Sequence, residues 1–322
     1  MNNIKKIGLS ALAGSLVATS AFAGEMAVSG SAKLTYTDKE SGSLTGSPFG
    51  MNKLLGFNGS GDLDNGHSVS VYFGNNGTSQ SSASLTYDMG DAGTLMFDQG
   101  AGGHGIGGID DKTPTANEEI WDNISHGTGH DGFRVGIGNS GSISYATTLG
   151  TAAISADYVR QGGGVVEDGA TGAAGSGSSK SISVTMAPAD GIAVGLGLAD
   201  LGSGNVSEDQ NQSTAFITYA VGALSFGGQL ATEGGQKDTA QWHTQQWGVT
   251  FNVSDNIAVG YGQRTVSFGS DSTLVDQEDS GLSASYTMGS MSVKGNINKS
   301  NDLKGASGTD LDTTEIAVSF AF

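Results

Sequence analysis

Five carboxylates gather in one short, glycine-rich stretch of the chain: Asp110, Asp111, Glu118, Glu119 and Asp122. The bases nearby are few, Lys112 and Arg134. Carboxylates held in a narrow passage concentrate cations and repel anions. On an open surface, the same acids would only be solvated. Their chemistry therefore depends on where the fold places this stretch.

A second chemistry open to this stretch is calcium binding. Asp110 and Asp111 with neighbouring carbonyls could hold Ca²⁺, a hard cation that takes oxygen ligands. His126 and His130 lack a third ligand at metal-site spacing, so solvated histidines are the simpler interpretation.

Enzyme motifs are missing from the sequence. "GHGIGG" has neither the strand-to-helix context nor the Lys-Ser/Thr of a phosphate cradle. Neither G-x-S-x-G nor H-E-x-x-H occurs. A secreted calcium-binding solenoid would repeat G-G-x-G-x-D every nine residues, and "GGIDD" occurs once without a period. We therefore expect a protein that is not an enzyme and that requires no cofactor.

The N-terminus predicts export. Lys5 and Lys6 precede a short apolar stretch that ends in Ala21-Phe22-Ala23, which is the pattern of a signal peptide over residues 1–23. A membrane anchor would need roughly 20 strongly apolar residues, and this stretch is shorter and contains Ser, Thr and Gly. The formal net charge is −18, so no basic footprint for nucleic acid is present. The chain has no cysteine and therefore no disulfides.

Alternation with a period of two runs through residues 24–322. In "MAVSGSAKLTYT", for example, Met26, Val28 and Leu34 share one face, while Ser29, Ser31 and Lys33 share the other. Such alternation, broken by Gly, Asn and Asp, is typical of half-buried antiparallel strands. We predict sixteen of them: 26–37, 51–63, 68–74, 82–89, 94–99, 140–148, 152–160, 180–187, 192–199, 213–221, 224–232, 244–253, 257–266, 281–288, 291–298 and 313–322.

The connections favour a membrane barrel over a soluble sandwich. Tight turns alternate with long polar loops near 38–50, 100–139, 161–179, 200–212, 267–280 and 299–312, which is the pattern of outer-membrane barrels. A sandwich of this many strands would have to hide two edges per sheet. The last strand stays apolar on one face to Phe320 and Phe322, as the lipid face of a closed barrel must.

Several segments resemble general diffusion porins of Gram-negative outer membranes, of the alphaproteobacterial type. They are "VSGSAKLTY", "LLGFNGSGDLDNGHSVSVYF", "SASLTYDMGDAGTLMFDQG", "GSISYATTLGTAAISADYV" and the terminal phenylalanine. The resemblance implies a sixteen-stranded antiparallel transmembrane β-barrel with an inward-folded third extracellular loop, here residues 101–139. It implies a homotrimer in outer-membrane lipid that passes small hydrophilic solutes and ions, and Phe322 as the signal for assembly.

Strand parity adds a basic wall to this expectation. Lys33, Arg264 and Lys294 fall on the inward parity of their strands. If the loop stays near its root at the fifth and sixth strands, these bases stand across the lumen from its acids and set up a transverse field. Each base could equally be one polar lumen residue among many.

Small residues suggest where subunits would meet. Gly30, Ala32, Gly59 and Gly61 fall on the outward parity of the first two strands, where they would allow close approach or mark a bend. Two other functions stay open: a barrel that serves as an adhesin or structural surface protein, and a solute-selective channel.

Overall fold

The computed structural model describes residues 24–39, 47–77, 80–122, 124, 137, 140–160, 178–202, 210–234, 241–269 and 273–322. The predicted signal peptide, His126 and His130 lie outside these residues. Within them, no helix is long and apolar enough to cross a membrane.

Sixteen strands make up most of the described chain. They are β1 (Met26–Lys39), β2 (Phe49–Asp62), β3 (Ser68–Asn75), β4 (Gln80–Asp88), β5 (Thr94–Gln99), β6 (Ser140–Leu149), β7 (Ala152–Arg160), β8 (Ser178–Ala189), β9 (Ile192–Leu201), β10 (Gln210–Val221), β11 (Leu224–Gly234), β12 (Trp242–Ser254), β13 (Ile257–Phe268), β14 (Gln277–Met288), β15 (Met291–Asn301) and β16 (Leu311–Ala321). Three short 3₁₀ helices accompany them: η1 (Gly90–Ala92), η2 (Gly105–Ile109) and η4 (Leu303–Gly305).

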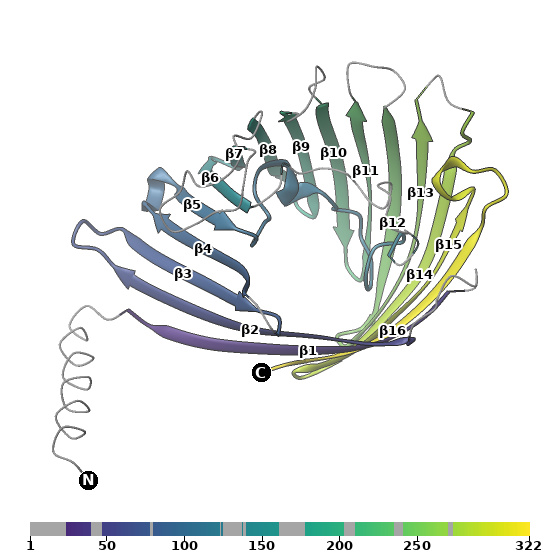
Figure 1. Cartoon of the computed structure of the whole chain (residues 1–322), viewed down its shortest axis with the longest axis horizontal. Helices are drawn as coiled ribbons and strands as arrows, with labels where there is room; N and C mark the ends of the chain where they lie inside the picture. The colour runs from purple at the N-terminus through teal and green to yellow at the C-terminus, as the bar shows by residue number, and fades with distance from the viewer. Residues whose placement is uncertain are drawn as a thin grey trace, which may run out of the picture.

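Every strand pairs antiparallel with its sequence neighbours, and β1 pairs with β16 to close the barrel (Figure 1). All sixteen predicted strands are confirmed, and their ends differ from the prediction by a few residues. The largest difference is in β14, which begins at Gln277 rather than at 281. Closure leaves no sheet edge, so the soluble sandwich is excluded.

The polarity of the two faces of the barrel wall is the reverse of that in a soluble protein, with apolar side chains outside and polar side chains inside. In β8, Ile182 is 44% exposed on the outside, whereas Ser181 and Ser183 on the inward parity are buried. The same alternation places polar side chains on the inner face around the ring, among them Gln229, Gln246, Asn296 and Asn298. An apolar outside and a polar inside suit a wall between hydrocarbon and water.

The turns after β2, β4, β6, β8, β10, β12 and β14 lie at one end of the barrel, which we call the turn end; the opposite end is the loop end. Gly191, Gly222 and Gly289 have φ of 73°, 58° and 60°, the left-handed conformation that two-residue hairpin turns require. Pro188 lies inside β8, just before the turn to β9, where the register with β9 shifts between Met186 and Ala189, and a proline is tolerated at such an irregularity.

Phe322 pairs with β1 where the barrel closes, and this contact, which we call the seam, explains why one of the small outward residues is a glycine. Gly30 N–H donates to the Phe322 carbonyl at 2.6 Å, and Phe322 N–H donates to the Gly30 carbonyl at 2.9 Å. A Cβ on Gly30 would overlap the Phe322 ring, so this glycine makes room for the terminal aromatic. A Cβ on Gly59 would meet nothing within 4 Å, so the space outside the wall at that position is open.

We expect Phe322→Asp to reduce the yield of folded barrel severely, because it places a carboxylate on the outward face and uncovers the seam at Gly30. Heat-modifiable mobility of the membrane fraction on gels measures the yield. Phe322→Trp is the matched control and should assemble. Normal amounts of folded Phe322→Asp protein would contradict this role of the last residue.

Candidate pore constriction

Residues 100–122, which we call the inner segment, leave the wall after β5 and run inside the barrel (Figure 1). Asp98 fixes the point at which the chain leaves the wall. Its buried carboxylate accepts hydrogen bonds from Ala101 N–H and Gly102 N–H, each at 2.6 Å, and its Oδ2 lies 3.4 Å from His104 Nε2. One side chain thus fixes the direction in which the chain turns into the lumen.

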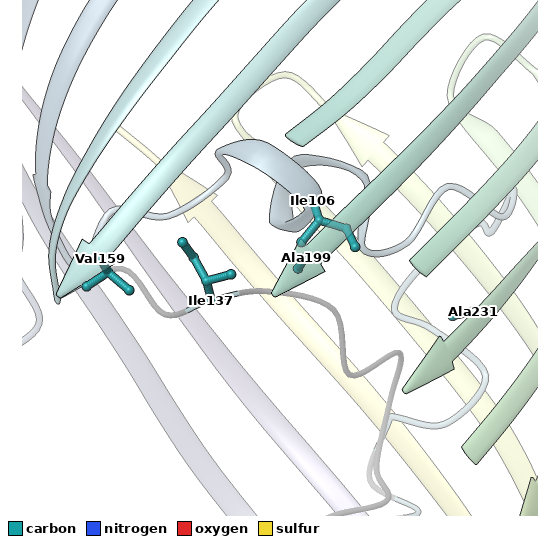
Figure 2. Close-up of a cluster of buried hydrophobic side chains, with 5 residues drawn as sticks. All are labelled: Ile106, Ile137, Val159, Ala199 and Ala231. Carbon is teal, nitrogen blue, oxygen red and sulfur yellow. The ribbon is translucent and has the colours of Figure 1, made fainter. Parts of the chain in front are cut away.

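The first part of the inner segment packs on the inner face of β7–β10. Gly105 N–H donates to Ser155 Oγ at 2.9 Å, and Ile106 N–H donates to Ser181 Oγ at 2.8 Å. Figure 2 shows Ile106 of η2 above Ala199 of β9, in a buried apolar cluster that also contains Ile137, Val159 and Ala231. Serines and a small apolar cluster together fix η2 on this stretch of wall.

Two glutamines hold the middle of the inner segment. Gln229 of β11 accepts from Lys112 N–H at 2.7 Å and donates to the Ile109 carbonyl at 2.8 Å. Gln246 of β12 donates to Asp111 Oδ1 at 2.8 Å. The same oxygen accepts from Thr113 N–H and Thr113 Oγ1, at 3.1 and 2.8 Å. Asp111 therefore shapes a turn of the backbone.

The last part reaches β14 and β15, far from where the segment began. Ala116 N–H donates to Ser283 Oγ at 3.1 Å. Asn298 Nδ2 donates to the carbonyls of Asp122 and Glu119, at 3.0 and 3.3 Å. The inner segment thus follows the inner wall from β7 to β15.

Glycines on the inward parity make room for this path. Gly262 and Gly281 face each other across β13 and β14. Ile120 Cγ2 would lie 3.0 Å from a Cβ on either of them. Real Cβ contacts are rarely this tight, so larger residues would push Ile120 away from the wall. The pair forms a shallow seat for one isoleucine.

This path corrects the expected transverse field. The acids do not stay near the root of the loop; the inner segment carries Glu118, Glu119 and Asp122 to the wall that holds the predicted bases. Lys33 Nζ of β1 lies 3.4 Å from Glu118 Oε1. Lys33 and Glu118, which were expected across the lumen from each other, are neighbours, because backbone contacts to polar wall residues hold the segment there.

Arg264 points inward as its parity predicted, but it does not line the open pore. Its side chain is 0% exposed and forms an ion pair with Asp279 at 2.6 Å. The Trp121 ring covers it, 4.7 Å from the guanidinium carbon. The prediction that Arg264 is a basic residue of the pore wall was therefore wrong. Asp279 offsets its charge, and the inner segment shields it from water.

Lys33 and Lys294 remain as half-buried bases on β1 and β15, the two strands that flank β16. Lys294 pairs with Ala317 of β16, and Lys33 pairs with Ser319 of the same strand. Both lysines therefore lie close to one level of the wall with small residues between them.

Asp110 and Glu119 stand out among the acids of the inner segment. Loss of hydration inside the barrel raises the pKa of both carboxyls above the usual range, although Asp110 keeps an exposed surface. The negative charge of Asp111 raises both further. Both side chains thus take up a proton at a higher pH than an ordinary carboxyl.

No group of three or more His, Asp or Glu side chains that could hold a metal occurs in the described part of the chain. Asp111 Oδ1 already accepts hydrogen bonds from Thr113 and Gln246. Calcium binding at Asp110 and Asp111 stays a prediction. Among the described residues, no third carboxylate or histidine joins these two at metal-binding distance.

Parity alone put Ser283, Gln229, Gln246 and Asn298 on the inner face, yet their role was not foreseen. Their partners are mainly backbone groups of the inner segment, 117 to 179 residues away for Gln229 and Asn298. A polar residue on a polar face carries no local sign of such a partner. The paired inward glycines at 262 and 281 were the one available signal.

No family model matches the chain, and no curated protein sequence matches it. Solved structures do. A porin refined at 1.8 Å resolution aligns with a TM-score of 0.67 and 15% identity, covering 92% of this chain and 100% of that one. An anion-selective porin from Comamonas acidovorans aligns at 0.66 and 14%, covering 92% and 99%. Salmonella typhi OmpF in complex with daunomycin aligns at 0.61 and 10%, covering 93% and 98%. This chain therefore has the sixteen-stranded porin fold.

The inner segment's path can be tested with a disulfide. The chain has no cysteine, so an Ala116→Cys/Ser283→Cys pair would be the only one present. We expect near-complete crosslinking on oxidation, read as a mobility shift on denaturing gels, because the two positions are in hydrogen-bond contact. The control, Ala116→Cys/Ser70→Cys, places the second cysteine five strands away around the ring and should stay reduced. Equal crosslinking of both pairs would contradict the path.

Proposed function

We propose that this chain is an outer-membrane porin, a channel for passive diffusion of small hydrophilic solutes and ions. The observation that carries the proposal is a closed barrel with an apolar outside, a polar inside and an inner segment that narrows the lumen without filling it. A cavity of about 870 Å³ lies on the turn side of that segment, bordered by Asp88, Thr94, Ser183, Thr185 and Lys112. Sixteen strands enclose an aqueous channel rather than a packed core.

A preference for cations is the finer part of the proposal. The inner segment supplies Asp110, Glu118 and Glu119 to the lumen, and Arg264 is offset by Asp279. The net charge of the chain, −18, adds a field of the same sign. Lys33 opposes it and is partly offset by its contact with Glu118. The barrel itself does not decide the sign of the preference, since the anion-selective porin from Comamonas acidovorans has the same fold.

Reversal potentials across planar bilayers in asymmetric KCl test this preference. We expect K⁺ to pass in preference to Cl⁻, and the triple change Asp110→Asn, Glu118→Gln, Glu119→Gln to bring the permeability ratio several-fold closer to one. Asp111 is left in place because it shapes the backbone. A clear anion preference of the unchanged protein would refute the cation assignment.

Two further arms sharpen the same measurement. Asp200→Asn/Glu278→Gln removes two charges from the outward parity and should leave the ratio unchanged. As the pH is lowered, the cation preference should begin to weaken at a higher pH than that at which ordinary carboxyls protonate. The reason is that the pKa values of Asp110 and Glu119 are raised. The triple variant should lose this early step.

A homotrimer is part of the proposal, with the outward face of β1 and β2 as its contact surface. Gly59 is open on that face, whereas β8 and β9 present bulky residues such as Leu196, which is 65% exposed. Small residues let backbones approach where burial gains little over lipid. This arrangement puts the N-terminal strands at the centre and the middle strands against lipid.

We expect Gly59→Trp to dissociate the oligomer and Leu196→Trp to leave it intact, because only the first would fill a subunit contact. Unheated gels and chemical crosslinking of the purified membranes read the oligomeric state. Both variants add an outward tryptophan, so general effects on insertion are matched. Equal tolerance of the two would remove this interface.

A further inference from the structure

A fully buried ion pair of the wall lies behind the inner segment. Arg264 donates through Nε to Asp279 Oδ2 at 2.6 Å, and its Nη2 lies 2.6 Å from the same oxygen. Gln277 Nε2 donates to both oxygens of Asp279, at 2.9 and 3.0 Å. Burying a charge is costly unless it is paired and hydrogen-bonded, and this pair meets both conditions. The guanidinium is thereby held in one orientation.

The guanidinium also meets the inner segment. The guanidinium carbon lies 4.7 Å from the centre of the Trp121 ring, within the range of a cation–π contact. A planar guanidinium offers a flat surface to an aromatic ring, which the point charge of a lysine does not. Arg264 thus presents a rigid platform to one side chain of the constriction.

Trp121 lies at the centre of the best-anchored part of that segment. The residue before it, Ile120, occupies the seat formed by Gly262 and Gly281. Asn298 binds the carbonyls on either side, of Glu119 and Asp122. The turn is closed by Asp122 N–H to the Glu119 carbonyl at 2.9 Å. Movement of Trp121 would therefore carry Glu118 and Glu119 with it.

We propose that Arg264 and Asp279 are positioning residues that set the width of the pore by holding Trp121 against the wall. The inference rests on the proposed channel function and adds a determinant of solute size to it. The pair contributes little field to the lumen because it is neutral and covered. Without the platform, the stretch from Thr115 to Asp122 loses its central contact and the opening widens.

A charge-neutral double replacement, Arg264→Met/Asp279→Leu, tests this. It keeps the net charge and leaves no unpaired buried ion. In single-channel recordings of the full-length protein we expect conductance to rise by about 1.5-fold or more, since conductance follows the open cross-section. Liposome swelling should then admit larger sugars than the unchanged protein does. Folded double-variant channels with unchanged conductance and size limit would overturn the proposal.

Two controls separate positioning from general stability. Lys180→Met/Asp200→Leu removes an ion pair of 3.1 Å from the outward face and should leave conductance unchanged. Trp121→Ala leaves the Arg264 pair intact and should widen the pore, while Trp121→Phe keeps the ring contact and should not. If the double replacement fails to fold, the Trp121 variants decide: equal conductance of the two would overturn the proposal.

A rescue arm gives the sharpest outcome. Adding the Ala116→Cys/Ser283→Cys disulfide to the double replacement should restore the original conductance when oxidised, and reductant should abolish the rescue. A conductance that does not respond to the disulfide would show that the change arises elsewhere in the barrel. Failure of the unchanged protein to conduct at all would instead refute the channel function.

Discussion

Complete backbone hydrogen bonding around a closed ring is the constraint from which the other features follow. A wall with hydrocarbon outside cannot leave N–H and C=O groups unpaired, and sixteen strands meet this demand only because β1 closes on β16. The closing pair brings Phe322 to Gly30, with backbone bonds of 2.6 and 2.9 Å. The last residue of the chain and a glycine near its start are thus parts of one seam.

Closure also creates a lumen too wide for wall side chains to fill, and the inner segment uses that space. Its backbone would be costly to bury without partners. The inner face supplies those partners as serine, glutamine and asparagine side chains, and it supplies room through Gly197, Gly262 and Gly281. The polar inner face therefore binds the inner segment through the backbone groups of that segment.

Charge in this lumen is used in two different ways. Arg264 and Asp279 are paired, buried and covered by Trp121, so they act through geometry. Asp110 on the inner segment is exposed, and Glu118 and Glu119 are partly buried; under the proposed function these carboxylates act on ions. Residue type alone does not separate these roles, since each set consists of ordinary titratable side chains at inward positions. Burial and pairing separate them.

The sequence by itself determined the strands, their parity, their number and the inward positions of Lys33, Arg264 and Lys294, because alternation is a local property with a period of two. Only the tertiary structure decided where the inner segment lies. Its position depends on contacts such as Lys33 with Glu118, 85 residues apart, and Asn298 with Asp122, 176 residues apart. No local pattern encodes which polar residue of a polar wall meets which backbone group. The expected separation of Lys33 from Glu118 was wrong for that reason, while the barrel that surrounds them was predictable.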